Sequence, residues 1–219
     1  MRKTPFIIGE FYHVYNRGTD HRKIVEDYFD RKRFLQSVLE FNTLEPIGSI
    51  YEEQFRKNSL GTPTTELKFK QKLVNIIAIC VNPNHYHLLL EQISDKGIEK
   101  FMQKLGGGYT RYFNEKYNRN GVLFQGKFKA IHVDSDEYLL FVSAYINLND
   151  RIHKVPSGIA YSSWDEYIGT PKCKEICSKD IILDRFRNKK EYRKFAEDVA
   201  LDTSRKREED KEFAELLLE

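Results

Sequence analysis

The chain is poor in cysteine, which limits both the compartment and the kind of site to be expected. It has three cysteines among 219 residues, Cys80, Cys173 and Cys177. An odd and sparse set argues against a disulfide framework and favours a reducing compartment. Cys173 and Cys177 could form half of a zinc site, but the sequence holds no second pair. We therefore interpret all three as ordinary thiols.

Long apolar runs are also lacking. No stretch of about 18 apolar residues exists, so we expect no membrane span. Residues 1–9 are too short and too mixed in character to predict a signal peptide. These absences predict a cytoplasmic protein without a membrane partner. The sequence leaves both a monomer and a homodimer open.

Hydrophobic residues make up 40% of the chain and aromatic residues 13%, enough for one well-buried domain with appendages. Charged residues reach 32%, and the net charge is only +3. The charge is unevenly distributed, because residues 96–129 hold eight basic and two acidic side chains, a net charge of +6. Such a stretch can attract polyanions, although a solvated helix face is an equally acceptable interpretation.

The first third of the chain predicts a strand, a helix and a long loop. Residues 11–15 (FYHVY) alternate and are rich in aromatics, which is typical of a strand, and residues 16–18 then predict a turn. Apolar residues at helical spacing then predict a helix at 30–41. Residues 45–70 contain two prolines, two glycines and many polar side chains, so we expect a loop or insertion there.

The middle of the chain predicts a β-hairpin followed by a helix. Two apolar runs, 73–81 and 85–91, flank the turn sequence Asn-Pro-Asn at 82–84. A helical stripe then extends over 98–113, interrupted by three glycines at 106–108. Because each glycine costs about 1 kcal/mol in a helix interior, we expect a kink or the close approach of another backbone.

The remaining elements complete an α+β pattern. Residues 122–133 predict a strand that a glycine bends or bulges. Asp134 or Ser135 can cap the next helix, which we expect to end near Asn149. After Pro156 we expect a loop (YSSWDEYIG) and then a charged helical tail.

The predicted order is β-α-β-β-α-β-α, which is close to a ferredoxin-like (RRM-like) arrangement. We therefore expect an antiparallel sheet with helices packed on one face. The predicted domain covers residues 1–155, and residues 156–219 form a C-terminal extension.

The sharpest chemical signal is His85-Tyr86-His87, followed by three leucines. Residues i and i+2 of a strand point to one face, so both imidazoles project together. Two neutral imidazoles can hold a divalent metal ion if a third ligand comes from elsewhere. For an isolated pattern of this kind, ordinary surface or core histidines remain the favoured alternative.

A second signal lies on the helix expected after Asp134. Tyr145 and Asn149 are four residues apart and would share a helix face. A tyrosine hydroxyl can attack a phosphodiester and form a covalent intermediate, although its ordinary pKa of about 10 means that it needs assistance at neutral pH. A metal ion could assist, with the Asn149 carbonyl oxygen as third ligand. Periodicity alone favours core packing, since Tyr138 and Phe141 complete a stripe with Tyr145.

Five motifs follow one another along the chain: YHVYNRG at 12–18, NPNHYHLL at 82–89, YTRYFN at 109–114, LFQGKFK at 123–129 and YINLN at 145–149. Together they resemble the motifs of the HUH single-tyrosine transposases. They are most similar to the REP-associated tyrosine transposase branch, relatives of the transposases of small insertion sequences. Each motif is weak alone, whereas five in the right order are specific, and the resemblance covers about residues 5–170.

The resemblance implies roles for individual residues. His85 and His87 match the metal ligands of the family, Tyr145 matches its nucleophile, and Asn149 matches the polar residue that completes the metal site. It further implies Mg²⁺ or Mn²⁺ as cofactor and single-stranded or hairpin DNA as partner. In this family the tyrosine takes the 5′ phosphate and frees a 3′ hydroxyl, without ATP.

Three features depart from the family pattern. Asp150 and Arg151 stand where a proline often follows the Tyr…Asn motif. The triple glycine stands where relatives usually carry bulkier residues. The insertion at 45–70 matches no motif of the family.

Basic and aromatic side chains indicate how DNA would be held. Four basic residues could neutralise phosphates and give a salt-dependent affinity. Two of them alternate with Phe128 and would face one side of their strand. Three aromatic residues could stack on unpaired bases, although core packing is favoured for them. The basic residues are Arg17, Arg111, Lys127 and Lys129, and the aromatic residues are Tyr109, Tyr112 and Phe124.

Three functions are compatible with these patterns. The first is an active transposase or a domesticated hairpin-processing nuclease, which the intact set of two histidines, tyrosine and asparagine favours. The second is a nucleic-acid-binding module without catalysis. The third is a metal-dependent RNA-processing enzyme on a similar sheet, which a dependence on the 2′ hydroxyl would identify.

Overall fold

The computed structural model describes residues 5–48, 50, 71–156, 158–170 and 175–216, with side chains up to residue 210. Cys173 and most of the predicted insertion at 45–70 lie outside this range. None of the helices in these ranges is long and apolar enough to cross a membrane. The elements are β1 Phe11–Arg17, the 3-10 helix η1 Thr19–His21, α1 Tyr28–Glu40, β2 Val74–Val81, β3 His85–Gln92, α3 Gly97–Lys116, β4 Lys129–Val133, α4 Asp136–Asn147, α5 Asn149–Ile152, β5 Tyr161–Ser162, α6 Trp164–Ile168, α7 Asp180–Leu183 and α8 Lys189–Leu216.

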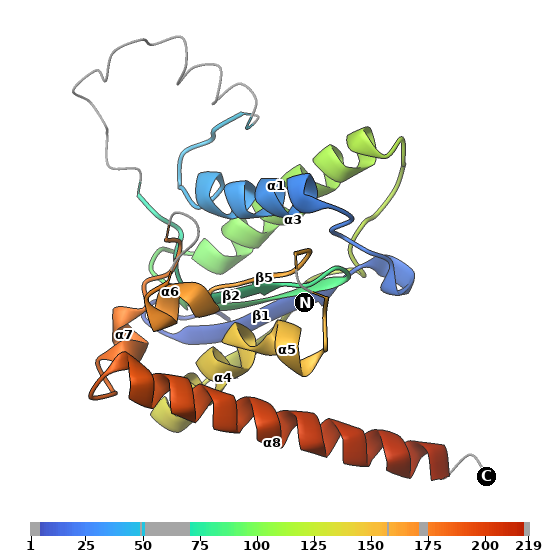
Figure 1. Cartoon of the computed structure of the whole chain (residues 1–219). Helices are drawn as coiled ribbons and strands as arrows, with labels where there is room; N and C mark the ends of the chain where they lie inside the picture. The colour runs from blue at the N-terminus through green and yellow to red at the C-terminus, as the bar shows by residue number, and fades with distance from the viewer. Residues whose placement is uncertain (1–4, 49, 51–70, 157, 171–174, 217–219) are drawn as a thin grey trace.

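An antiparallel sheet with the strand order β4-β1-β3-β2-β5 lies at the centre of the molecule (Figure 1). The predicted hairpin is confirmed as β2 and β3, and Asn82 N donates to His85 O across its turn at 2.8 Å. The first six core elements alternate as β-α-β-β-α-β, as expected. The predicted α+β class and ferredoxin-like order are therefore confirmed.

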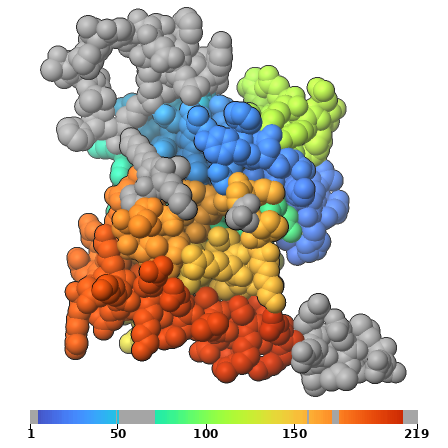
Figure 2. Space-filling model, viewed as in Figure 1, coloured from blue at the N-terminus to red at the C-terminus, as the bar shows by residue number. Residues whose placement is uncertain are grey.

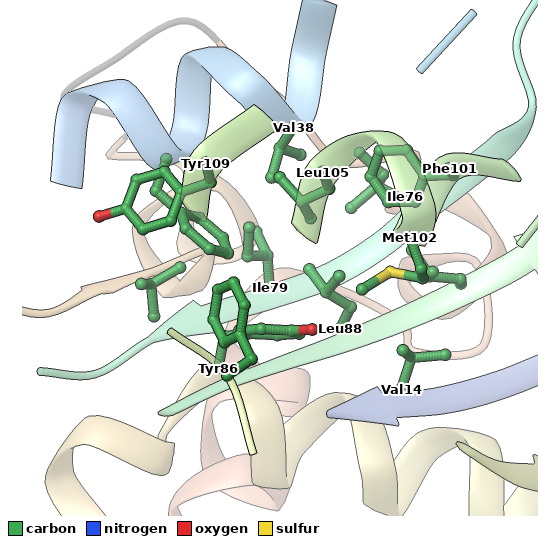
Figure 3. Close-up of a cluster of buried hydrophobic side chains, with 14 of the residues drawn as sticks. Val14, Val38, Ile76, Ile79, Tyr86, Leu88, Phe101, Met102, Leu105 and Tyr109 are labelled. Atoms are coloured by element: carbon green, nitrogen blue, oxygen red, sulfur yellow. The ribbon is translucent and has the colours of Figure 1, made fainter. Parts of the chain in front are cut away.

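Helices cover both faces of the sheet, and the expectation of helices on one face is wrong. Helices α1 and α3 lie on one side, whereas α4, α5 and α8 lie on the other (Figure 1). Strand alternation produces two separate cores. Figure 3 shows Tyr86 and Leu88 of β3 among the side chains of the first core, together with Leu105 and Tyr109 of α3.

The second core lies between the sheet and α4. Leu89 of β3 belongs to it, one residue away from Leu88 on the opposite face. A register shift in β2 between Ile76 and Ala78 lets both Ile77 and Ala78 join this second core. The sheet is thus apolar on both faces, which is why the hydrophobic runs of β2 and β3 are nearly continuous.

Helix α3 continues through its three glycines, so the expected interruption is wrong. The expected close approach does occur at Gly108, but the group that approaches is the side chain of Phe41 and not a backbone. A Cβ atom on Gly108 would lie 2.4 Å from Phe41 Cζ. At Gly106 and Gly107 a Cβ atom would meet nothing within 4 Å. Only one of the three glycines is therefore required by packing.

Replacing Gly108 by alanine is expected to lower the free energy of unfolding by about 1–3 kcal/mol, because the buried Phe41 ring must move. Gly106→Ala is the matched control. It is expected to raise the free energy of unfolding by up to about 1 kcal/mol, since alanine favours the helix. Urea unfolding followed by circular dichroism measures both. Equal effects of the two changes would contradict the packing assignment.

Several predicted boundaries differ from the structure. Only residues 129–133 of the expected strand 122–133 form β4, and Phe124 makes an isolated bridge with Gly18. The cap at Ser135 is confirmed, since its side chain accepts from Tyr138 N. The expected loop YSSWDEYIG contains β5, the edge strand beside β2, and helix α6.

Helix α8 packs along the outer side of α4 and α5, as Figures 1 and 2 show. Tyr192 of α8 is fully buried in the second core. Its hydroxyl accepts from Asn147 Nδ2 at 2.7 Å. Near the other end of α8, Glu208 pairs with Lys154 Nζ at 2.8 Å, just after α5. This helix is therefore anchored to α4 and α5 at two separate places. The predicted division at residue 155 stays a prediction.

Candidate functional site

The two histidines of β3 lie on the sheet face that α4 covers. Leu89 packs in the second core, and His85 and His87 are related to it by the two-residue period of the strand. On β1, Tyr15 stands directly opposite His87 and therefore shares its face. His13, two residues before Tyr15, lies on the same face. The predicted projection of both imidazoles to one side agrees with this packing.

The His85 ring is held from several sides. Its Nδ1 lies 2.7 Å from Asn84 Oδ1, and its Nε2 lies 3.0 Å from Asn82 Nδ2 and 3.2 Å from Asn149 Oδ1. Because Asn84 Oδ1 only accepts and Asn82 Nδ2 donates, the proton of the neutral ring belongs on Nδ1 and leaves a lone pair on Nε2. His153 follows α5, and its ring centroid is 4.7 Å from that of His85.

His87 is more deeply placed and contacts His13 on β1. Its Nδ1 lies 2.8 Å from His13 Nε2, and both side chains are buried. Burial lowers the pKa of His87 well below its usual value, and the neighbouring histidines act in the same direction. Burial also lowers the pKa of His13 to about 4. Both imidazoles are therefore uncharged at neutral pH.

Tyr145 of α4 lies beside these histidines of its own chain. Its ring centroid is 5.6 Å from that of His87 and 6.1 Å from that of His13, edge to face in both cases. Phe141, one turn earlier, stacks on Tyr145 with a distance of 6.4 Å between the ring centroids. The side chain is half-buried and contacts the edge of the second core. Tyr145 therefore both packs against the core and lies beside the histidines.

Burial raises the pKa of Tyr145, while nearby Asn149 and the positive charge of Arg207 act in the opposite direction. Burial lowers the pKa of His85 and of His153, and the charge of Arg207, which comes from α8, acts in the same direction. Helix α8 thus places a cation within electrostatic range of the tyrosine and of two histidines. No periodicity or motif in the sequence connects this arginine with the site.

Asn149 reaches the site from a second helix. The expectation of one continuous helix to Asn149 is wrong, because α4 ends at Asn147 and Leu148 lies at the junction with φ −114°. Asn149 is the first residue of α5 and is fully buried. Its Oδ1 accepts from Asn82 Nδ2 at 2.8 Å, so the β2–β3 turn orients the amide. Tyr145 and Asn149 still converge, although not through the spacing of a single helix.

The chemistry of the donors fits a divalent metal ion at His85, His87 and Asn149. Metal ligation requires neutral imidazoles with a free ring nitrogen, which the lowered pKa values and the His85–Asn84 hydrogen bond favour. The Asn149 amide presents its oxygen toward His85 Nε2. No group of three histidine, cysteine, aspartate or glutamate side chains in the described residues could hold a metal ion. Any site here therefore depends on the amide oxygen.

The four basic residues expected to bind DNA fall into two groups. Arg17 stands opposite His85 on β1, and Lys129 stands opposite Tyr15 on β4, so both share the face of the histidines. Arg111 and Lys127 instead line a cavity of about 920 Å³ between α3 and the 121–128 segment. Lys127 precedes β4, so its expected alternation with Lys129 on one strand is wrong.

The aromatic residues considered for base stacking belong mainly to the first core. Tyr109 is fully buried, and its hydroxyl donates to Ile24 O at 2.6 Å. Phe124 is also buried, and Tyr112 is partly buried against the same core. The preference for core packing is confirmed for Tyr109 and Phe124. Phe124 also contributes to the wall of the cavity.

Sequence reasoning missed two histidines at this site. His13 lies inside the YHVYNRG motif, and the strand period could have placed it on one face with Tyr15. His153 is four residues after Asn149, a spacing that places two side chains on one side of a helical turn. The contact of each with the His85–His87 pair depends on strand register and on the α4–α5 junction.

An antiparallel ferredoxin-like sheet with two histidines on a central strand and a tyrosine on a flanking helix is an arrangement suited to phosphodiester chemistry. Residues 54–149 match the model of the family of IS200-like transposases. The match contains His85, His87, Tyr145 and Asn149. The resemblance inferred from the sequence motifs is thus confirmed.

A solved structure described as a REP-associated tyrosine transposase bound to a REP hairpin has a similar fold. The match has a TM-score of 0.50 at 10% identity and covers 83% of this chain and 92% of the other. At that identity the similarity shows the fold alone. No curated protein matches the chain by sequence.

Proposed function

We propose that the protein is a metal-dependent transposase that cleaves and rejoins single-stranded DNA near hairpins through a 5′-phosphotyrosine intermediate. The observation that carries the proposal is the position of Tyr145, whose ring lies 5.6 Å from that of His87 within one chain. Asn149 Oδ1 lies 3.2 Å from His85 Nε2 in the same site. The match of residues 54–149 to the IS200-like transposase family supports it.

Tyr145 is the proposed nucleophile. Its phenol oxygen bonds to the phosphorus, the bond from phosphorus to the 3′ oxygen breaks, and the downstream fragment stays attached to the tyrosine through its 5′ phosphate. The phenol loses a proton and the departing 3′ oxygen gains one. Attack by a 3′ hydroxyl on the phosphotyrosine reverses these steps and rejoins DNA, so no ATP is needed.

The raised pKa of Tyr145 means that the phenol is protonated at neutral pH before attack. Its proton must therefore leave as the new bond forms. Arg207 and Asn149 both favour the charged form of the phenol and assist this step.

His85, His87 and Asn149 are the proposed ligands of Mg²⁺ or Mn²⁺. When bound, the ion would polarise the scissile phosphate and stabilise the negative charge that develops on it. The chain itself keeps the two imidazoles neutral and orients the amide oxygen.

DNA is the proposed partner, in single-stranded or hairpin form. The solved relative is bound to a REP hairpin, which supports this choice. Arg17 and Lys129 would hold phosphates beside the histidines. Arg111 and Lys127 would hold phosphates at the cavity on the other face of the sheet. One DNA strand could thus contact both pairs of basic residues by passing around the edge of the sheet at β4, where Arg17 donates to Gln125.

The proposal is tested by incubating the protein with single-stranded hairpin DNA from the flanks of its own gene and Mn²⁺. Mass spectrometry should detect an adduct equal to the protein plus the 5′-phosphorylated fragment. The adduct should map to the peptide that contains Tyr145. Binding without an adduct, across hairpins from both flanks, would favour a hairpin-binding protein without catalysis. Cleavage only of substrates with a 2′ hydroxyl would favour RNA processing.

Replacing Lys127 by alanine is expected to weaken hairpin binding and to reduce the slope of log K against log salt by about one, because one phosphate contact is lost. Arg111→Ala should do the same. Lys100→Ala is the matched control on α3, since Lys100 Nζ donates to Asp95 O and does not line the cavity. Fluorescence anisotropy over a salt series measures the slopes. An unchanged slope for both cavity variants would show that DNA does not contact the cavity.

A further inference from the structure

The Nδ1 atoms of His85 and His87 are each in contact with a neighbouring polar atom. His85 Nδ1 lies 2.7 Å from Asn84 Oδ1, and His87 Nδ1 lies 2.8 Å from His13 Nε2. The same ring position is engaged in both residues, although the partners come from different elements. The Nε2 atom thereby keeps its lone pair in both rings, provided that the proton of each contact belongs to Nδ1.

For His85 the proton is assigned by two amide partners, since Asn84 Oδ1 at Nδ1 cannot donate and Asn82 Nδ2 at Nε2 can. For His87 the partner is another imidazole, and two nitrogens 2.8 Å apart share one proton that either ring could supply. If His13 donated, the single proton of His87 would move to Nε2, which could then no longer act as a ligand. If His13 accepts, His87 has the same tautomer as His85.

We propose that His13 is a positioning residue whose Nε2 accepts the Nδ1–H of His87 and so keeps His87 Nε2 available as a ligand. This inference rests on the proposed function, because it concerns the orientation of a proposed metal ligand. A hydrogen bond from the distal ring nitrogen to an outer acceptor is the usual way in which proteins orient a metal-binding histidine.

The surroundings of His13 suit this role. The side chain is 7% exposed, and its ring contacts that of Tyr15 at 5.1 Å and that of Tyr145 at 6.1 Å. The register of β1 and β3 places His13 opposite Leu89 and Tyr15 opposite His87, so His13 reaches His87 diagonally across the sheet. A ring fixed from both sides presents its Nε2 in one direction. His13 would therefore connect the orientation of His87 with the packing of Tyr145.

The test measures Mn²⁺ affinity by isothermal titration calorimetry on the full chain without DNA. His13→Phe keeps a ring of similar shape and removes the acceptor, and it is expected to weaken Mn²⁺ binding by about 10–100-fold. His13→Gln can still accept through Oε1 and should recover part of the affinity. His132→Phe is the matched control, because His132 lies on β4 and pairs with Glu10 away from the site. It should bind Mn²⁺ as the wild type does.

A second measurement makes the test independent of metal binding. In metal-free wild-type protein, ¹H–¹⁵N correlation spectra of the histidine rings should show His87 with its proton on Nδ1. His13→Phe should abolish this preference while thermal unfolding shows that the variant is folded. A His87 proton on Nε2 in the wild type, or Mn²⁺ affinity of a folded His13→Phe equal to that of the wild type, would overturn the proposal. If the wild type binds no Mn²⁺ but has the expected tautomer, the proposed metal chemistry fails and the role of His13 in orienting His87 stands.

Discussion

Replacing Tyr145 by phenylalanine is expected to abolish the covalent adduct and to reduce nicking by at least about 10³-fold, because the attacking oxygen is removed. Hairpin binding should be retained, since the ring contacts with His87 and His13 do not involve the hydroxyl. The variant should also fold normally, because phenylalanine preserves the stacking on Phe141. Denaturing gel electrophoresis of end-labelled hairpin DNA measures nicking and adduct together.

Tyr138→Phe is the matched control for this change. Tyr138 lies on the same helix, and its ring stacks on Phe141 with a distance of 6.3 Å between the ring centroids. It should nick and form adducts as the wild type does. An adduct that persists in Tyr145→Phe would show that another of the thirteen tyrosines is the nucleophile.

Replacing His85 by alanine is expected to remove metal-dependent cleavage. The loss should exceed the roughly 100-fold effect that changes in outer partners of metal ligands produce. The change removes the ring nitrogen that faces Asn149 Oδ1 at 3.2 Å. Initial nicking rates over a Mn²⁺ series, on protein first washed with a chelator, measure the effect. The washed wild type should be inactive and should recover when Mn²⁺ is added.

His132→Ala is the control for His85→Ala, since it removes an imidazole of the same sheet that is more than a third exposed and lies on another strand. It should leave the Mn²⁺ dependence unchanged. Equal cleavage by His85→Ala and the wild type after chelator washing would show that the proposed metal site is not used. Together with Tyr145→Phe, this result would separate a wrong metal assignment from a wrong nucleophile.

The local features of the site could be predicted because they depend on short-range geometry. The two-residue period of a strand places His85 and His87 on one face, and the Asn-Pro-Asn turn defines the hairpin that carries them. The cap at Ser135 similarly determines where the helix of Tyr145 begins. Each of these depends on a few neighbouring residues, and each agrees with the structure.

Features that depend on distant contacts were predicted poorly. The helices were expected on one face, yet the apolar runs of β2 and β3 leave two faces to be covered, and α4 and α8 cover the second. Lys127 was placed on a strand, but pairing with β1 begins only at Lys129. The triple glycine was expected to interrupt α3, but Gly108 is explained by the ring of Phe41, which is far away in sequence.

The sequence by itself determined the α+β class, the element order and the four residues that define the candidate site. Strand periodicity, turn residues and family motifs each depend on residues that are close together in the sequence. Only the tertiary structure decided which partners those residues have. The register of β1 against β3 brings His13 to His87, the break at Leu148 directs Asn149 toward His85, and α8 returns to place the charge of Arg207 near Tyr145. These pairs are 62 to 74 residues apart in the chain. They follow from the packing of whole elements, for which no local pattern carries a signal.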